Sequence, residues 1–424
     1  MAMRKYLPRI ADELLERSLK ASGAVLIEGP KWCGKTSTAF HKAKTAIYMQ
    51  DPDQRTNYLQ IANTKPSLLL QGETPRLIDE WQLAPILWDA VRHEVDQRNE
   101  PSQFILTGSA VPILDEKISH TGTGRISRIR MRTMSLFESN DSNGQVSLKQ
   151  IFDGCEEVKG IAKLSIEALA ECIVRGGWPA SLGTDRAVYE KRVIDYVDAV
   201  VEMDVSSVDG VAKDPQKASA LLRSISRNIS TEASMETLRR DMQGGENGIA
   251  STPTITNYLN ALQRIFVTED LEAWNPSIRS KTPLRTSLKR HFVDPSIACA
   301  SLGISGVKLL KDFNTFGYLF ESLCIRDLRV YADYLDGKIY HYRDKTNLEC
   351  DAVVVLRDGR WGAIEVKMGA SEFDSAAENL IKLKDRINTD KMMEPSFLMI
   401  LSATDFAYTR EDGIHVVPIG CLKW

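Results

Sequence analysis

The sequence predicts an α/β fold in three parts: a parallel sheet covered by helices, a largely helical middle, and a second α/β part. Three observations indicate this. Short apolar segments alternate with helical segments of about 10–15 residues over the first part of the chain. Residues 147 to 240 have a mostly helical pattern, and strand patterns return after about residue 305. At about 150 residues per domain, 424 residues also correspond to roughly three domains.

Composition excludes several classes of protein. With 43% apolar residues the chain can form cores, which excludes a disordered or fibrous protein. The balance of 54 basic and 57 acidic residues disfavours a globally basic nucleic-acid binder. No apolar run approaches the roughly 18 residues that span a bilayer, and the start lacks the apolar core of a signal peptide. Seven scattered cysteines without a CxxC spacing indicate thiols in a reducing compartment. We therefore expect a soluble cytoplasmic protein without a membrane partner.

The elements of the first part follow in order. An amphipathic helix over about 8 to 20 opens the chain, and a buried strand at 24–28 and a helix over 34–44 come next. Apolar runs at 46–49, 68–70, 77–79 and 104–107 are strand candidates, with a helix over 85–99 among them. This alternation is typical of βαβ units in a parallel sheet. The polar stretch from Glu138 to Gly144 predicts a linker.

The segment GPKWCGKT fits the phosphate-loop pattern GxxxxGK[ST], between an apolar strand and a helix. Backbone amides of such a loop surround phosphate oxygens at the positive end of the helix. Lys35 would reach the β- and γ-phosphates of ATP, and the Thr36 hydroxyl would ligate Mg²⁺. The predicted ATP-binding residues of this loop are Gly29, Pro30, Lys31, Trp32, Cys33, Gly34, Lys35, Thr36 and Ser37.

Polar residues at two later strand ends complete this site. Asp79 would hold Mg²⁺ through water, and Glu80 would polarise the attacking water; the alternative for this pair is a helix cap with a first-turn acid. Thr107 or Ser109 would lie between the γ-phosphate and that water, or simply cap the strand. Arg125 could be presented to a neighbour's phosphate, which makes a homo-oligomer a candidate assembly, or be a solvated surface residue.

These segments, GPKWCGKT, RLIDEWQ, FILTGSA and TGTGRISRIRMRTMSLFE, occur in an order that resembles the prokaryotic AAA-type ATPases with a C-terminal domain of unknown function. Arg175-Gly176-Gly177-Trp178-Pro179 and the stretch from Asp195 to Asp204 are also similar to that family. The resemblance covers nearly the whole chain. It implies an AAA-type P-loop ATPase domain over residues 1–137.

In the middle part, residues 145–300, a helix that begins near Thr254 and a short strand region from Phe266 to Trp274 resemble a winged helix-turn-helix. A basic run follows, and it makes DNA a candidate partner; a solvated wing or a protein-interaction module is the alternative. Its members are Arg279, Lys281, Arg285, Lys289, Arg290 and His291.

The last part, residues 305–424, resembles the PD-(D/E)xK nuclease core of restriction-endonuclease-like folds. The resemblance implies that Asp351 and Glu365 bind Mg²⁺, that Glu321 adds a carboxylate from a helix, and that Lys367 orients water or the phosphate. Strand geometry adds a test: Asp351 pairs with Glu365 only if the hairpin closes from Leu356 to Arg360. We therefore predict a three-residue loop with Gly359 in the left-handed conformation, or a bulge, and two carboxylates close enough to share a metal.

The leading functional hypothesis is ATP binding and hydrolysis, with Mg²⁺, coupled to nucleic-acid handling by a nuclease-like domain. The alternative is a nucleotide-switched regulatory or interaction protein in which the nuclease-like fold is inert. A metabolic P-loop kinase is disfavoured because no lid or acceptor site is recognisable and two further domains would lack a role.

Overall fold

The computed structural model describes residues 6–111, 123–208, 210–242, 251–276, 287–387 and 392–424. Its first part is a five-stranded sheet with the order β2-β3-β4-β1-β5, and every pairing in it is parallel, as predicted. The strands are β1 (Ala24–Glu28), β2 (Thr45–Tyr48), β3 (Arg76–Asp79), β4 (Phe104–Gly108) and β5 (Ile126–Arg130). The helices are α1 (Ile10–Ala21), α2 (Lys35–Lys42), α3 (Arg55–Thr64) and α4 (Ile86–Arg98).

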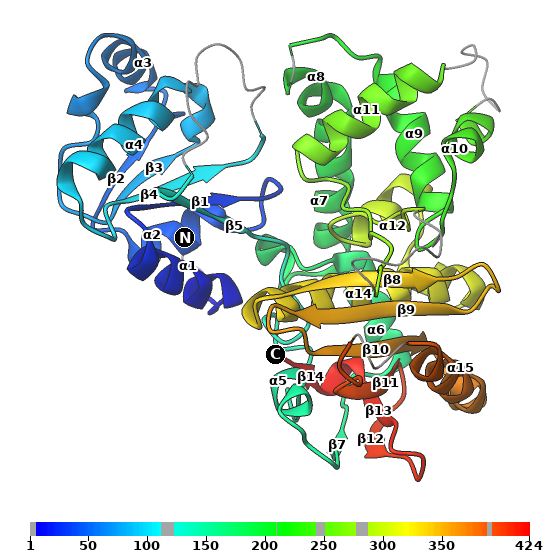
Figure 1. Ribbon diagram of the computed structural model, residues 1–424. Helices are drawn as coiled ribbons and strands as arrows, with labels where there is room; N and C mark the ends of the chain where they lie inside the picture. Colours follow the sequence, from blue (N-terminus) through cyan, green and yellow to red (C-terminus); the bar gives the residue numbers. More distant parts are fainter. Residues whose placement is uncertain (1–5, 112–122, 209, 243–250, 277–286, 388–391) are drawn as a thin grey trace.

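Helices cover both faces of this sheet (Figure 1). Side chains that alternate along β1 enter two separate cores: Val25 and Ile27 pack with α1 and α2, whereas Ala24 and Leu26 pack with α3 and α4. A strand whose two faces are both buried must be apolar throughout, which explains the continuous apolar run of β1.

The apolar run at residues 68–70 is not a strand. A short 3-10 helix, Pro66–Leu68, occupies its start, and a turn follows it. Leu69 and Leu70 are nevertheless buried in the core beneath α3 and α4. The run is apolar because it fills that core, and the proline before it favours a turn over an extended strand.

The helical part stands beside this domain (Figure 1). It contains α6 (Ile166–Arg175), α7 (Arg186–Ala199), a π-helical turn Val200–Asp204, α8 (Val205–Ser207), α9 (Pro215–Arg227), α10 (Met235–Met242), α11 (Thr252–Arg264), α12 (Ser296–Leu302) and α13 (Gly306–Leu309). The predicted strand region after α11 forms only isolated bridges in the described residues, including one from Thr268 to Phe292 and one from Leu271 to Lys289. The described chain therefore lacks the regular wing of the winged-helix prediction.

The last part is a seven-stranded mixed sheet with the order β7-β12-β13-β11-β10-β9-β8. Two helices cover it: α14 (Phe313–Tyr334) and α15 (Phe373–Arg386). Its strands are β7 (Gly160–Ile161), β8 (Gly337–Arg343), β9 (Glu349–Leu356), β10 (Trp361–Lys367), β11 (Phe397–Ser402), β12 (Phe406–Thr409) and β13 (His415–Pro418). A separate ladder joins β6 (Val146–Ser147) to β14 (Leu422–Lys423), and α5 (Leu148–Phe152) follows β6. Within the stretch predicted as mostly helical, β7 thus belongs to the seven-stranded sheet and Ser147 of β6 to the separate ladder.

The hairpin from β9 to β10 has the predicted register. The Leu356 amide donates to the Arg360 carbonyl (2.8 Å), and Gly359, at the third loop position, has φ 91°. The ladder runs from Trp361 opposite Val355 to Ile364 opposite Ala352, which is the register that aligns Asp351 with Glu365. The regular ladder ends one pair short of these two acids.

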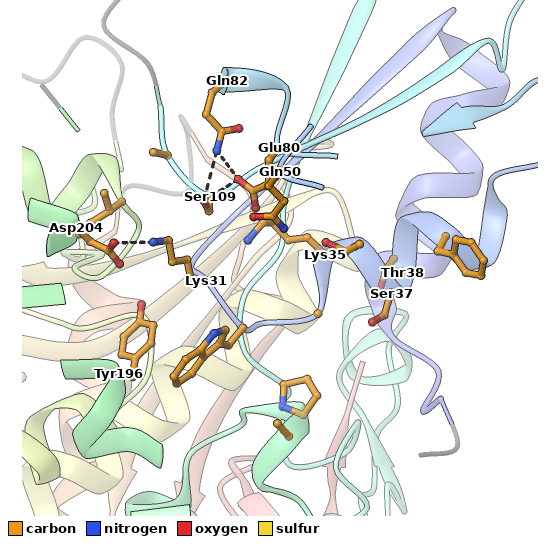
Figure 2. A pocket seen from close by; sticks show the side chains of 18 of the residues that line it. Lys31, Lys35, Ser37, Thr38, Gln50, Glu80, Gln82, Ser109, Tyr196 and Asp204 are labelled. Carbon is orange, nitrogen blue, oxygen red and sulfur yellow. Dashed lines mark hydrogen bonds and ion pairs between the residues drawn. The ribbon is translucent and has the colours of Figure 1, made fainter. Parts of the chain in front are cut away.

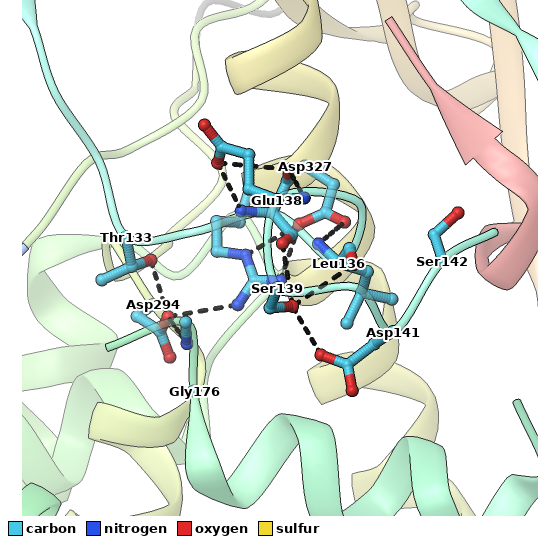
Figure 3. Close-up of polar contacts among 12 residues, drawn as sticks. Thr133, Leu136, Glu138, Ser139, Asp141, Ser142, Gly176, Asp294 and Asp327 are labelled. Atoms are coloured by element: carbon cyan, nitrogen blue, oxygen red, sulfur yellow. Dashed lines mark hydrogen bonds and ion pairs between the residues drawn. The ribbon is translucent and has the colours of Figure 1, made fainter. Parts of the chain in front are cut away.

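The stretch from Glu138 to Gly144 is not a free linker. The Glu138 carboxylate is buried, pairs with Arg9 (3.1 Å) and accepts the Ser135 amide (2.8 Å). Just before it, the Leu136 amide donates to Asp327 of α14 (2.9 Å). These contacts form a polar junction between the three parts of the chain (Figure 3). Glu138 and Ser142 of this stretch are buried and bonded to protein partners rather than exposed to solvent, which composition alone does not distinguish.

Candidate functional site

The phosphate loop connects the end of β1 to α2 and has the conformation that its sequence predicts. Gly34 has φ 104°, which favours glycine. A side chain at Gly29 would meet the carbonyl oxygen of Met131 at 2.0 Å, so only glycine fits there. Lys35 begins α2, is buried, and donates to the carbonyl of Pro30 (2.8 Å) in the same loop. The ammonium is thus already held inside the loop that would bind phosphate.

The predicted magnesium ligands lie together because β1 and β3 are parallel and end at the same edge of the sheet. The Thr36 hydroxyl donates to Asp79 Oδ1 (2.7 Å), and the Thr107 hydroxyl donates to the same oxygen (2.6 Å). Burial raises the pKa of Asp79, and the two hydroxyl contacts oppose that rise. A hydroxyl beside a carboxylate at a phosphate loop fits Mg²⁺ with a nucleotide phosphate.

Glu80 follows Asp79 in the left-handed conformation, with φ 55°. Its amide donates to the Thr107 hydroxyl (3.2 Å), and its carboxylate accepts hydrogen bonds from Ser109 (3.0 Å) and from Gln82. The strained backbone therefore turns the carboxylate toward the end of β4. Both hydroxyl residues predicted from the sequence, Thr107 and Ser109, contact the two acids.

A cavity of about 1950 Å³ opens over this site. The predicted residues that line it are Lys31, Trp32, Gly34, Lys35, Thr36, Ser37, Glu80 and Ser109. Gly29, Pro30, Cys33, Asp79 and Thr107 are not among its lining residues. The cavity is therefore formed on one side by the loop and by the ends of β3 and β4.

The opposite wall of the cavity comes from the helical part. Arg192 and Tyr196 of α7 line it, together with Asp204 of the π-helical turn. Lys31 Nζ lies 2.5 Å from Asp204 Oδ1, and Figure 2 shows this pair across the cavity. The exposed ring of Trp32 lies 5.6 Å from that of Tyr196. The phosphate loop is thus joined to a second domain by an ion pair and an aromatic contact.

Arg125 is placed away from this chain's own phosphate loop. Its carbonyl accepts the amide of Ala24 (3.1 Å), at the start of β1, whereas the loop follows the end of β1. Five residues of strand separate the two edges by about 16 Å. The guanidinium pairs with Asp96 (2.8 Å) on α4. A contact with a neighbouring chain's nucleotide stays a prediction.

The acids predicted in the C-terminal domain share two lysines. Lys367 Nζ lies 2.7 Å from Glu365 Oε2 and 3.5 Å from Asp351 Oδ2. Lys289 Nζ lies 2.9 Å from Glu321 Oε1 and 3.2 Å from Asp351 Oδ1. The structure therefore brings together all four predicted residues and adds a fifth, Lys289, which the sequence analysis assigned to a different role.

The ionisation of these acids follows from burial and from the two ammonium groups. Burial opposes ionisation of Asp351, but Lys289 and Lys367 outweigh it and lower its pKa to about 2. Burial and the charge of Asp351 raise the pKa of Glu365 to about 8. Burial raises the pKa of Glu321 to about 7, against the attraction of Lys289. Within the described residues, no group of three or more histidine, cysteine, aspartate or glutamate side chains is arranged to hold a metal ion.

The predicted basic run does not form a DNA-binding surface where it is described. Lys289, Arg290 and His291 are buried, and Arg290 pairs with Asp270 (2.5 Å). Arg279, Lys281 and Arg285 lie outside the described residues. The local sequence of a basic run does not reveal whether its side chains are buried against acids elsewhere in the chain, as Lys289 and Arg290 are.

Sequence reasoning missed the second wall of the cavity and the role of Lys289. Arg192 and Asp204 carry no local motif, and their part in the site follows only from the packing of the helical domain against the loop. Lys289 is separated from Asp351 by 62 residues, so no spacing rule could join them.

Comparison with known proteins finds a family match in each of three successive regions of the chain. An AAA domain matches residues 21–140, a Domain of unknown function (DUF8612) matches residues 166–308, and a Domain of unknown function (DUF4143) matches residues 316–422. Over 368 residues the chain is 25% identical to Uncharacterized protein Rv2008c of Mycobacterium tuberculosis, covering 85% of this chain and 73% of that protein. Uncharacterized protein Mb2031c of Mycobacterium bovis has the same identity and coverage.

Two solved structures resemble parts of the fold. The Walker-type ATPase PABY2304 of Pyrococcus abyssi matches with a TM-score of 0.43 at 13% identity, over 68% of this chain and 94% of that one. AMPPCP-bound DnaA from Aquifex aeolicus matches with a TM-score of 0.30 at 13% identity, over 62% and 89%. In the described residues, no helix combines the length and the apolar character needed to cross a membrane. The phosphate-loop geometry and the family matches lead to one conclusion: the chain carries an N-terminal AAA-type P-loop ATPase domain, followed by two domains from families without an assigned function.

Proposed function

We propose that this protein is a nucleotide-switched ATPase, in which ATP bound at the phosphate loop changes how the helical part packs against the ATPase domain. The observation that carries this proposal is the shared cavity, with Lys31 of the loop paired to Asp204 of the π-helical turn. A γ-phosphate beside Lys31 would compete with Asp204 for the same ammonium. Binding and hydrolysis would therefore alter a contact between two domains.

The chemistry at the loop would follow the roles of the described side chains. Lys35 would leave the Pro30 carbonyl for the β- and γ-phosphates. Thr36 would hold Mg²⁺ directly, and Asp79 would hold it through water. Glu80, oriented by Ser109 and Gln82, would accept a proton from the attacking water. Mg²⁺ would neutralise charge that develops on the phosphate oxygens.

Hydrogen exchange tests the switch. Glu80→Gln, which should bind ATP without rapid turnover, is compared with and without ATP and Mg²⁺ in the full chain. We expect slower exchange in the loop and, because ATP would take Lys31 from Asp204, a change in exchange over residues 192–208 as well. A change confined to the loop would contradict the switch, while leaving ATP binding intact. Lys35→Ala, which should not bind ATP tightly, is the negative control.

A second candidate function, Mg²⁺-dependent nucleic-acid cleavage, is favoured by one observation. The β9–β10 register brings Asp351, Glu365 and Lys367 to a common cluster. Two assays separate this candidate from the switch. Nucleic-acid cleavage would be supported if DNA stimulates ATP hydrolysis and is also cut by wild type but not by Asp351→Ala. ATP turnover unchanged by single- or double-stranded DNA, with no cleavage in Mg²⁺ or Mn²⁺, would favour the switch alone.

A further inference from the structure

Lys289 brings a positive charge from one domain into the acidic cluster of the next. It lies in the part of the chain matched as residues 166–308, whereas its two partners, Glu321 and Asp351, lie within residues 316–422. The lysine side chain is 6% exposed, and those of the two acids are 13% and 14% exposed. An ammonium enclosed in this way has exchanged its water for carboxylate oxygens.

Each of the three acids already has an ammonium as its partner. Asp351 Oδ1 accepts a hydrogen bond from Lys289. Its Oδ2 accepts a hydrogen bond from the Val366 amide (2.9 Å) and lies 3.5 Å from Lys367 Nζ. One oxygen each of Glu321 and Glu365 also faces an ammonium. A divalent ion held by Asp351 would need oxygens that the two ammonium groups already contact, because hard cations bind carboxylate oxygen at about 2.0–2.6 Å.

The backbone around Lys289 fixes the lysine in place. Its amide donates to the Leu271 carbonyl (3.0 Å), and its carbonyl accepts the Leu271 amide (2.8 Å). Next to it, Arg290 pairs with Asp270, whose side chain is 5% exposed. Metal entry would thus require the ammonium to leave its acids while its backbone stays held, and an unpaired buried ammonium is costly.

We propose that Lys289 acts as a tethered cation that takes the place of a divalent metal and closes the carboxylate cluster of the C-terminal domain. The inference is independent of the ATPase switch, and it concerns the cluster on which the second candidate function depends. Removal of the charge leaves three largely enclosed carboxyl groups with Lys367 as their ammonium partner. That imbalance favours uptake of Mg²⁺ or Mn²⁺ by the same oxygens.

Mn²⁺ binding to the nucleotide-free full chain tests this. Electron paramagnetic resonance of free Mn²⁺ gives the binding curve for wild type, Lys289→Met, Lys289→Arg, Asp351→Asn and Lys289→Met/Asp351→Asn. Methionine keeps the length of the side chain without its charge, and arginine keeps the charge. We expect Lys289→Met to gain one site that binds Mn²⁺ at least about tenfold more tightly than any site in wild type, and the double variant to lose it. Lys289→Arg should behave as wild type.

Two outcomes would overturn the proposal. In the first, wild type binds Mn²⁺ at a site that is lost in Asp351→Asn. In the second, Lys289→Met folds but gains no Mn²⁺ site. If Lys289→Met does not fold, the comparison of wild type with Asp351→Asn still decides, because binding that depends on Asp351 refutes a closed cluster and equal curves support it. Wild type that binds Mn²⁺ and cleaves DNA would refute this inference and support the second candidate function.

Discussion

We expect nucleotide chemistry to depend most directly on the loop lysine, Lys35. In the structure its ammonium donates to a carbonyl of the loop, Pro30, and is shielded from solvent. Exchanging that neutral acceptor for the β- and γ-phosphates replaces an ordinary hydrogen bond with charge-assisted ones. The energy of that exchange is available only when a nucleotide is bound.

Lys35→Ala should therefore abolish ATP hydrolysis and weaken ATP binding, measured by steady-state turnover and by calorimetric titration. The matched control is Lys42→Ala, at the other end of α2, whose ammonium pairs with the exposed acid Glu16. That control should hydrolyse ATP as wild type does. Normal turnover in Lys35→Ala would refute the assignment of the phosphate loop.

A substitution at Glu80 should separate ATP binding from hydrolysis. Glu80→Gln keeps the shape of the side chain and its contacts with Ser109 and Gln82 but removes the base. We expect ATP affinity within about threefold of wild type and turnover slower by at least about a hundredfold. Single-turnover kinetics measure the chemical step directly. A variant that hydrolyses at the normal rate would show that Glu80 only caps the end of β3.

We expect Asp327 to make the free energy of unfolding depend on pH. Burial raises its pKa in the folded protein from 3.8 to about 6, against the attraction of Arg326. Unfolding then releases a proton between these pH values, so the stability associated with Asp327 is fully present below about pH 4 and is lost as pH rises to about 6. The free energy of unfolding is measured with urea at several pH values. Over this interval, its slope against pH should be less negative in Asp327→Asn than in wild type. An unchanged slope would contradict the raised pKa, whatever the variant does to stability itself.

At the scale of elements, sequence reasoning works where local rules apply. Strand β1, the loop and α2 follow from an apolar run, two required glycines and a helical pattern. The closure of the β9–β10 hairpin follows from the alternation of side chains along each strand and from Gly359, which accepts a positive φ. The reasoning failed at residues 68–70 and at Lys289, because both are buried by distant parts of the chain. An apolar turn then has the same local sequence as a strand, and a buried lysine the same local sequence as a basic surface.

The hairpin allows a paired test of glycine conformation. Gly359→Ala places a side chain at φ 91°, with Met393 at 3.9 Å as its nearest contact, so backbone strain alone should cost about 1 kcal/mol. Gly317, within α14, has open space around it, and Gly317→Ala should stabilise the protein by about 0.5–1 kcal/mol. Thermal unfolding of both variants measures the difference. Equal effects of the two substitutions would contradict the left-handed loop position.

At the scale of the whole molecule, a buried polar junction connects the three domains. Arg9 donates to the phosphate-loop carbonyl of Cys33 (2.9 Å) and pairs with Glu138, while Arg326 of α14 lies 3.2 Å from Asp294 of the helical part. Figure 3 shows the part of this junction around Glu138, Asp294 and Asp327. Its members are far apart in sequence, so only the folded chain reveals them. The junction gives the loop a physical connection to both other domains.

In the proposed function, the helical part supplies one wall of the nucleotide site. Arg192 of α7 lines the cavity, whereas Arg186 of the same helix pairs with Glu190 and Glu171 and does not line it. The most direct measurement is the dissociation constant of ATP with Mg²⁺ for Glu80→Gln, alone and combined with Arg192→Ala or Arg186→Ala. A charge-assisted contact with phosphate contributes about 1.5–3 kcal/mol. We predict that Arg192→Ala weakens binding about tenfold or more and that Arg186→Ala leaves it unchanged, and equal affinities for all three proteins would contradict a shared site.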